Sequence, residues 1–279
     1  ETVLLAPEDV LHAFGMSVYG AMAPMVGHPN SPVIMEPIFA IDMHVRALST
    51  ASLSAMADIM RATHLDEAIF ASLCRESDMY HVLQRCAILV SRMALTMPPP
   101  MFHDMVRATA SWPDLCRRLI STSATLSHAR SRKLVALGLA HMLRHASAQD
   151  KGLLSAVPDM IGMWTEVVGE VVEDEAGSAD RYERELSPTR ALEIGEDGIP
   201  FLDEFGLIEA APTPSSARTD AVRSRDPSFN VPLRAYVADT LNAVLQNGSY
   251  KTQLQSLLAT IDPLVLDTLQ RGLSERPVA

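Results

Sequence analysis

Apolar residues recur at helical spacing along most of this 279-residue chain, and the pattern stops in one segment. Amphipathic stretches with the period of an α-helix lie on both sides of that segment, and no alternating strand pattern of useful length occurs. Leu, Ala and Met are abundant, and aromatic residues make up 5%, which is low for an all-β protein. The sequence therefore predicts an all-α fold.

The interrupting segment is strongly acidic. Between Glu166 and Glu209 the chain has 14 acidic and 3 basic residues, so this stretch carries the whole net charge of −11 and the remainder is neutral. Residues 173–228 also contain several Pro and Gly residues and a Ser/Thr cluster. We predict a long acidic insertion here that is at least partly disordered.

The chain is expected to have three parts: helical repeats in residues 1–172, the acidic insertion in 173–228, and C-terminal helices that close the stack in 229–279. Short helices in antiparallel pairs can form a globular bundle or a solenoid of stacked repeats. The pairs recur at about the ~40-residue period of HEAT repeats, although no clean repeat is visible. This spacing favours a HEAT-repeat-type α-solenoid.

Local signals place some helix boundaries. Ser111-Trp112-Pro113-Asp114 has the pattern of a capping box with a proline in the first turn, so we predict a helix start there. Residues 147–150 predict the cap of a long helix that runs to about Val172, with Leu153, Leu154 and Trp164 on one side. The stretch from Arg130 to Leu143 is apolar on most of its circumference, which predicts a helix buried between neighbours.

The charged residues supply the candidate binding sites. The acidic insertion would attract a basic partner protein, and its candidate residues are Glu173, Asp174, Glu175, Asp180, Glu196, Asp197, Asp203 and Glu204. A smaller basic group is either a set of solvated helix ends or a docking site for the insertion or for an acidic partner; it comprises Arg117, Arg118, Arg130, Arg132 and Lys133.

Nothing in the sequence matches a common catalytic or cofactor-binding motif. GxGxxG, GxxxxGK and GxSxG patterns are absent, so we expect no cofactor and no enzyme activity. His141 and His145 are four residues apart and would share a helix face, but Met142 stands where a zincin helix has Glu, and a surface pair near Arg144 is the plainer interpretation. We expect no metal site.

The three cysteines, Cys74, Cys86 and Cys116, have no CxxC spacing and are typical of reduced, buried small hydrophobes. Cys86 could pair with a histidine as a catalytic thiol only if the fold brought them together. The pI near 5.2 argues against nucleic-acid binding, which needs a basic surface. The longest apolar stretches are broken by His, Asp or Arg, so we expect no membrane insertion.

The order of segments from about residue 130 to 273 is similar to a known family. The run from Arg132 to Leu139 resembles a piece near the C-terminus of importin-β-type nuclear transport receptors. A long helix, an acidic linker and Arg225-Asp226-Pro227 follow in the same order, and the ending from Leu257 to Gln270 resembles the importin-eleven branch of these karyopherins.

The resemblance implies a HEAT-repeat solenoid that acts in nuclear import. Such receptors bind cargo in the cytoplasm, contact Phe-Gly nucleoporin repeats in the pore and release cargo when Ran-GTP binds, so they are found in nucleus, cytoplasm and nuclear envelope. Their Ran-binding region is N-terminal, and because the chain begins at Glu1 within a helical pattern, we expect that region to be absent here. An export receptor, a HEAT-repeat adaptor without a transport role and, more remotely, an all-helical enzyme remain alternatives.

Overall fold

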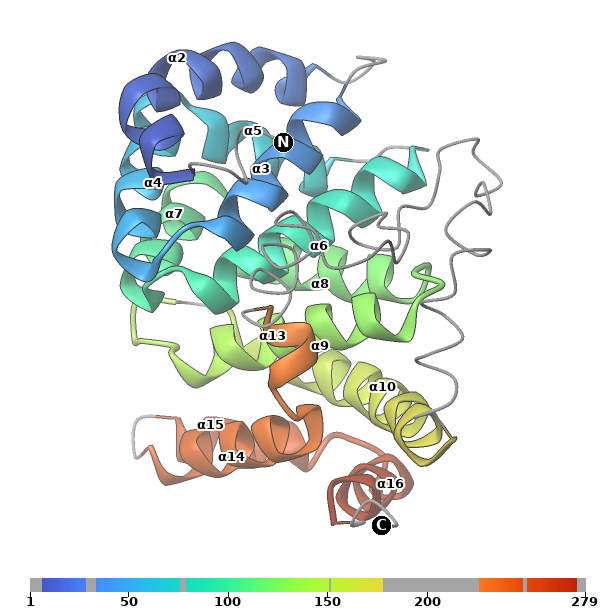
Figure 1. The fold of residues 1–279 in the computed structure, drawn as a ribbon. Coiled ribbons are helices and arrows are strands. Elements are labelled where there is room, and N and C mark those ends of the chain that lie inside the picture. The colour runs from blue at the N-terminus through green and yellow to red at the C-terminus, as the bar shows by residue number, and fades with distance from the viewer. Residues whose placement is uncertain are drawn as a thin grey trace.

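The structure, a computed structural model, consists of helices stacked in two layers (Figure 1). It describes residues 7–28, 34–75, 79–150, 152–177, 226–247 and 250–274, with residues 171–177 described as backbone only. Every regular element within these ranges is helical. The predicted all-α solenoid is therefore confirmed.

The first layer contains one helix from each repeat, and each helix packs against the next. Its members are α2 (Pro7–Gly27), α5 (Leu65–Cys74), α8 (Trp112–Ser123) and α10 (Val157–Gly177), with α16 (Pro263–Ser274) packed on α10 at the end.

The second layer is formed in the same way, and Figure 1 shows its helices following one another from the top of the view downward. Its members are α3 (Met35–Ala47), α6 (Tyr80–Thr96), α9 (Ala129–Arg144) and α14 (Leu233–Gln246). The remaining elements are α4 (Thr50–Ala62), α7 (Pro99–Thr109), the 3₁₀ helix η1 (Leu154–Ala156), α13 (Pro227–Asn230) and α15 (Lys251–Leu258).

A short third helix follows each of the first two second-layer helices: α4 after α3, and α7 after α6. The second-layer helices α3, α6 and α9 begin at residues 35, 80 and 129, so successive repeats are 45 and 49 residues apart. This spacing is near the ~40–47 residues of HEAT and armadillo units and longer than the ~34 residues of a TPR unit.

Close contacts between α6, α9 and α10 form the centre of the core. Trp164 is fully buried, and its indole N–H donates to the Ala136 carbonyl at 3.1 Å, which joins α10 to α9. Gly138 faces Ser91 so closely that a Cβ atom built on the glycine would lie 2.9 Å from the Ser91 Cα. The absence of a side chain at residue 138 therefore sets how closely α6 and α9 approach.

The predicted capping residues act as expected at α8, but the long helix begins later than predicted. The Ser111 hydroxyl accepts a hydrogen bond from the Asp114 N–H at 3.3 Å. Residues 152–156 form a turn and a 3₁₀ helix, and α10 starts at Val157. Pro158 accounts for this start, since proline fits the first turn of a helix and disfavours helix before it.

Helical structure also extends into both edges of the range predicted for the insertion. α10 continues to Gly177, past the predicted end near Val172, because Glu is a good helix former. The chain is described again from Asp226, which is buried, and α13 begins at the next residue. Residues 178–225 lie outside the described part, so the division into three parts stays a prediction.

Asp150 joins three elements around the turn after α9. Its carboxylate accepts from the Arg107 guanidinium at 2.7 Å, the Trp112 indole at 3.1 Å and the Ser147 N–H at 2.7 Å, and it contacts His103 Nδ1 at 2.9 Å. Burial alone would raise the pKa of this carboxyl, but the hydrogen bonds from Ser147 and His103 outweigh burial and lower the pKa. The polar cluster fixes α7 and α8 against the turn that leads into α10.

Among the described helices, α2 alone is long and apolar enough to cross a membrane by length and composition. It packs against α3, α4 and α5, with Leu11, Tyr19 and Val26 buried. A core helix meets the same criteria of length and composition as a membrane span. The expectation of no membrane insertion therefore stays a prediction.

We predict that Gly138→Ala destabilises the protein by about 1–3 kcal/mol, because the added methyl group would push α6 and α9 apart. Helix propensity alone would favour Ala by about 1 kcal/mol. Gly162→Ala in α10 is the matched control: its Cβ would meet no atom within 4 Å, so this change should stabilise. Urea denaturation measures both, and a stabilised Gly138→Ala variant would show that the close approach is unimportant.

Candidate functional site

The predicted acidic residues fall at the end of α10 and beyond it. Glu173, Asp174 and Glu175 belong to the last part of α10, where only the backbone is described. The other five, Asp180, Glu196, Asp197, Asp203 and Glu204, lie outside the described residues. The first two members of the acidic stretch, Glu166 and Glu170, are described on α10 and are partly exposed.

The five predicted basic residues lie on two helices and in different environments. Arg117 is exposed on α8 and pairs with Asp114 at 2.9 Å, while the neighbouring Arg118 is half-buried. On α9, the Arg130 guanidinium lies over the Phe229 ring, 4.0 Å from its centroid, and Lys133 is buried. Sequence neighbours therefore point into different surroundings, and these five residues do not form one exposed basic patch.

Arg132, the fifth of them, contacts the beginning of the acidic stretch. Its guanidinium donates to the Glu166 carboxylate at 3.1 Å and also to the carboxylate of Glu170. The arginine side chain is mostly buried, whereas that of Glu166 is 67% exposed. The pair joins α9 to α10, and its glutamate side faces solvent.

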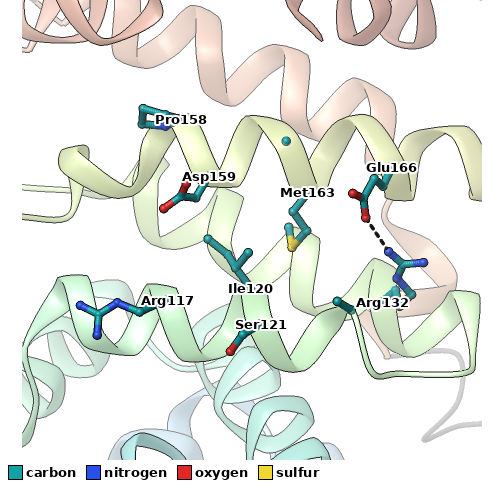
Figure 2. A pocket seen from close by; sticks show the side chains of 10 residues that line it. Arg117, Ile120, Ser121, Arg132, Pro158, Asp159, Met163 and Glu166 are labelled. Atoms are coloured by element: carbon teal, nitrogen blue, oxygen red, sulfur yellow. Dashed lines mark hydrogen bonds and ion pairs between the residues drawn. The ribbon is translucent and has the colours of Figure 1, made fainter. Parts of the chain in front are cut away.

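A groove of about 470 Å³ runs between α8 and α10, and the Arg132–Glu166 pair lies at one end of it (Figure 2). Its centre is apolar, with Ile120 from α8 and Met163 from α10 facing each other. The full lining is Arg117, Ile120, Ser121, Ala124, Arg132, Pro158, Asp159, Gly162, Met163 and Glu166.

Gly162 lines this groove. It lies inside α10, where glycine costs about 1 kcal/mol relative to alanine. No atom of the described chain lies within 4 Å of the position that its Cβ would take. Internal packing therefore does not account for the glycine, whereas an external group entering the groove would use the space.

A second polar site lies where the described chain resumes at Asp226. Arg92 on α6 is fully buried; it donates to Asp42 on α3 at 2.8 Å and to the carboxylate of Asp226. Arg46 pairs with Asp42 at 2.7 Å and lies 3.8 Å from the Asp226 carboxylate. We call Asp42, Arg46 and Arg92 the arginine pocket; Asp226 occupies it.

The charge balance in the arginine pocket depends on Asp226. Burial would raise the pKa of Asp42, but the positive charges of Arg46 and Arg92 outweigh burial and lower the pKa, with Arg85 adding to their effect. Asp226 brings a further carboxylate to Arg46 and Arg92. Because a buried charge needs a partner, Arg92 requires an acidic group at this place.

Sequence analysis did not identify the arginine pocket. Two signals pointed toward it: Arg92 lies among Leu89, Val90 and Met93 on an apolar helix, and Asp226-Pro227 has the pattern of a helix start. Neither signal names a partner, because Arg92 and Asp226 are 134 residues apart in the sequence.

The cysteines are placed as buried hydrophobes would be. Cys86 and Cys116 are fully buried, and burial raises the pKa of each thiol to about 12; Cys74 is half-buried. Thiols of such high pKa are poor nucleophiles at neutral pH, which disfavours the catalytic pairing considered for Cys86. Within the described ranges no cluster of His, Cys, Asp and Glu is arranged to hold a metal ion.

His141 on α9 faces α14 at the seam between these helices, and His145 caps the end of α9. The rings of His141 and His145 lie 4.4 Å apart, and His141 Nδ1 is hydrogen-bonded to the Tyr236 hydroxyl. Burial lowers the pKa of His141 to about 4, with a smaller effect of His145. A neutral imidazole therefore holds α14 against α9.

His44 is a second buried imidazole. It contacts the Tyr19 hydroxyl through Nδ1 at 2.6 Å and the Pro7 carbonyl through Nε2 at 2.9 Å. Burial lowers its pKa, although the Pro7 carbonyl and Glu8 oppose the shift. The neutral ring can donate to Pro7 and accept from Tyr19, so the neutral form satisfies both contacts.

We predict that stability falls as the pH is lowered from 7 to 5. Since His44 and His141 have lowered pKa values in the folded protein, the unfolded chain binds more protons below its His pKa of about 6.5, and acid favours unfolding. The urea midpoint against pH tests this, and His141→Phe should flatten the slope. The pKa of exposed His64 is raised through its hydrogen bond to Glu67, so protonation of His64 favours the folded state. His64→Gln should therefore not flatten the slope. An unchanged slope in His141→Phe would contradict the account.

Comparison with known proteins gives one match. A family model described as "Importin-11-like, TPR repeats" matches residues 2–274. The description gives TPR repeats, whereas the spacing of α3, α6 and α9 is nearer that of HEAT and armadillo units; both types are stacks of antiparallel helices. No curated protein and no solved structure matches the chain.

Proposed function

This chain belongs to the importin-11-like family, and we propose that it is a cargo-binding and scaffold region of a nuclear import receptor, which carries proteins through the nuclear pore in a Ran-dependent cycle. The role is one of binding, and not of catalysis. The protein would move between cytoplasm and nucleus and be found at the nuclear envelope.

The observation that carries this proposal is the groove between α8 and α10. We infer that the groove accepts a Phe-Gly repeat. The phenylalanine ring of the repeat needs an apolar cleft, and the glycine of the repeat lets the backbone of the repeat come close to the groove. Ile120 and Met163 supply apolar walls, and Gly162 adds open space on the α10 side. Methionine adapts to different partner shapes, which suits binding to many similar repeats.

Basic cargo is the partner that the charge distribution favours. Glu166, at the start of the acidic stretch, and Asp159, earlier on α10, line the groove, and Glu170 lies beside Glu166 on Arg132. Acidic residues of the predicted insertion would extend this field. Such a surface speeds encounter with basic proteins and loses this effect at high salt.

We predict that Gly162→Leu weakens binding of a Phe-Gly repeat peptide at least tenfold, because the new side chain fills the groove. Gly169→Leu is the matched control: it is also a glycine within α10 with no atom within 4 Å of its Cβ position, but it does not line the groove. Fluorescence anisotropy with a labelled peptide measures both affinities. Equal affinity in the two variants would exclude the groove as the Phe-Gly site.

The direction of transport needs a separate experiment. Ran-GTP releases cargo from an import receptor and is required for cargo binding by an export receptor. A pull-down of basic nuclear proteins with the receptor, with and without Ran-GTP, therefore distinguishes the two. Loss of cargo on addition of Ran-GTP supports import, and retention only in its presence supports export.

A further inference from the structure

We propose that the groove between α8 and α10 selects Phe-Gly segments that carry a lysine or arginine two positions from the phenylalanine, and that Asp159 binds this basic residue. The inference rests on the proposed function, because it concerns the same groove and adds the charge of the segment that the groove prefers. Asp159 is then a specificity-determining residue, whereas Ile120 and Met163 hold the aromatic ring.

One row of residues forms the α10 side of the groove. Asp159, Gly162, Met163 and Glu166 follow the i, i+3, i+4, i+7 spacing, so they share one face of the helix. Figure 2 shows Asp159 and Glu166 on either side of Met163. The row therefore places a carboxylate at each end of an apolar centre, and the two acidic residues are about 10 Å apart along the helix axis.

The two carboxylates differ in whether the chain itself neutralises them. Glu166 is paired with Arg132 at 3.1 Å at its end of the groove. Asp159 is exposed, and within the described part of the chain no hydrogen bond or ion pair joins its side chain to another residue. Arg117 lies at the same end (Figure 2), but it is paired with Asp114 on its own helix at 2.9 Å. Asp159 is therefore the charge that a bound segment can neutralise.

The distance from Asp159 to the apolar centre sets the position of the basic residue in the segment. Met163 follows Asp159 by four residues, which is about 6 Å along the helix axis. An extended segment advances about 3.3 Å per residue, and its alternate side chains point to the same face. A basic side chain two positions from the phenylalanine therefore lies on the face that meets the groove and reaches Asp159.

Asp159 also lies in the first turn of α10, where a carboxylate stabilises the helix whether or not a segment is bound. That effect does not depend on the charge of the bound segment. A comparison of peptides that differ only in charge therefore separates recognition by Asp159 from its effect on the helix.

Three labelled peptides test the inference by fluorescence anisotropy with the full chain at low salt. One peptide has lysine two positions before the phenylalanine of Phe-Gly, one has lysine two positions after it, and the third has serine at both positions. One of the lysine peptides should bind about two- to fivefold more tightly than the serine peptide, which is the range for an exposed ion pair. The direction in which the segment lies in the groove decides which of the two binds more tightly.

Asp159→Asn should abolish this preference, so that the three peptides bind this variant with equal affinity. Asp267→Asn is the matched control, because it removes the same charge from an exposed position on α16 and does not line the groove. The preference for lysine should remain in this control. Asp159→Lys should reverse the preference, so that a peptide with glutamate in place of lysine binds more tightly than the serine peptide.

Two kinds of failure can be distinguished. If the lysine and serine peptides bind the unmodified protein equally, or if the preference survives in Asp159→Asn or is lost in Asp267→Asn as well, this inference is overturned and the Phe-Gly proposal stands. If none of the peptides binds the unmodified protein, the proposed Phe-Gly site is overturned and this inference with it.

Discussion

The buried guanidinium of Arg92 is the group on which the arrangement of this solenoid depends. It lies on α6, within the apolar second layer, and has no exposure to solvent. A charge in that place is tolerated only if acidic groups surround it. Among the described residues, Asp42 comes from the preceding repeat, and Asp226 comes from the point where the described chain resumes after residue 225. The same interaction therefore determines where the chain returns to the solenoid and how α13 and α14 continue it.

Apolar packing alone would not fix that return point. α13 has four residues and buries little surface, so its packing on α9 cannot specify the register by itself. The carboxylate of Asp226 can, because it has to meet Arg92 and Arg46 together and cap α13 at the same time. Buried ion pairs often contribute more to specificity of arrangement than to stability, and this pair has the position for such a role.

The groove and the arginine pocket differ in chemistry and in layer. The groove between α8 and α10 has an apolar centre with Met163 and Ile120, acidic residues on its α10 side, and a glycine that internal packing does not explain. The arginine pocket on the second layer is basic and is occupied by a residue of the same chain. A solenoid offers such separate surfaces because each repeat exposes a different helix on each face.

Periodicity and capping residues predicted the helices because both are local properties. Ser111 and Pro113 placed the start of α8, and the apolar pattern before residue 172 placed most of the described helices from α2 to α10. Their packing partners could not be predicted in the same way. Arg130, Arg132 and Lys133 are near neighbours in sequence, yet they face Phe229, two glutamates and the protein interior, respectively. The pairing of Arg92 with Asp226 depends on a contact 134 residues distant, which no local pattern contains.

A double-mutant cycle between Arg92 and Asp226 tests the central claim most directly. The free energies of unfolding of Arg92→Met, Asp226→Ala and the double variant are measured by urea denaturation. If these residues form one unit, each single substitution lowers the free energy of unfolding by about 3–5 kcal/mol. The loss in the double variant is then smaller than the sum of the two single losses by about 2 kcal/mol or more. Additive effects, within about 0.5 kcal/mol, would show that the return of the chain does not depend on this ion pair.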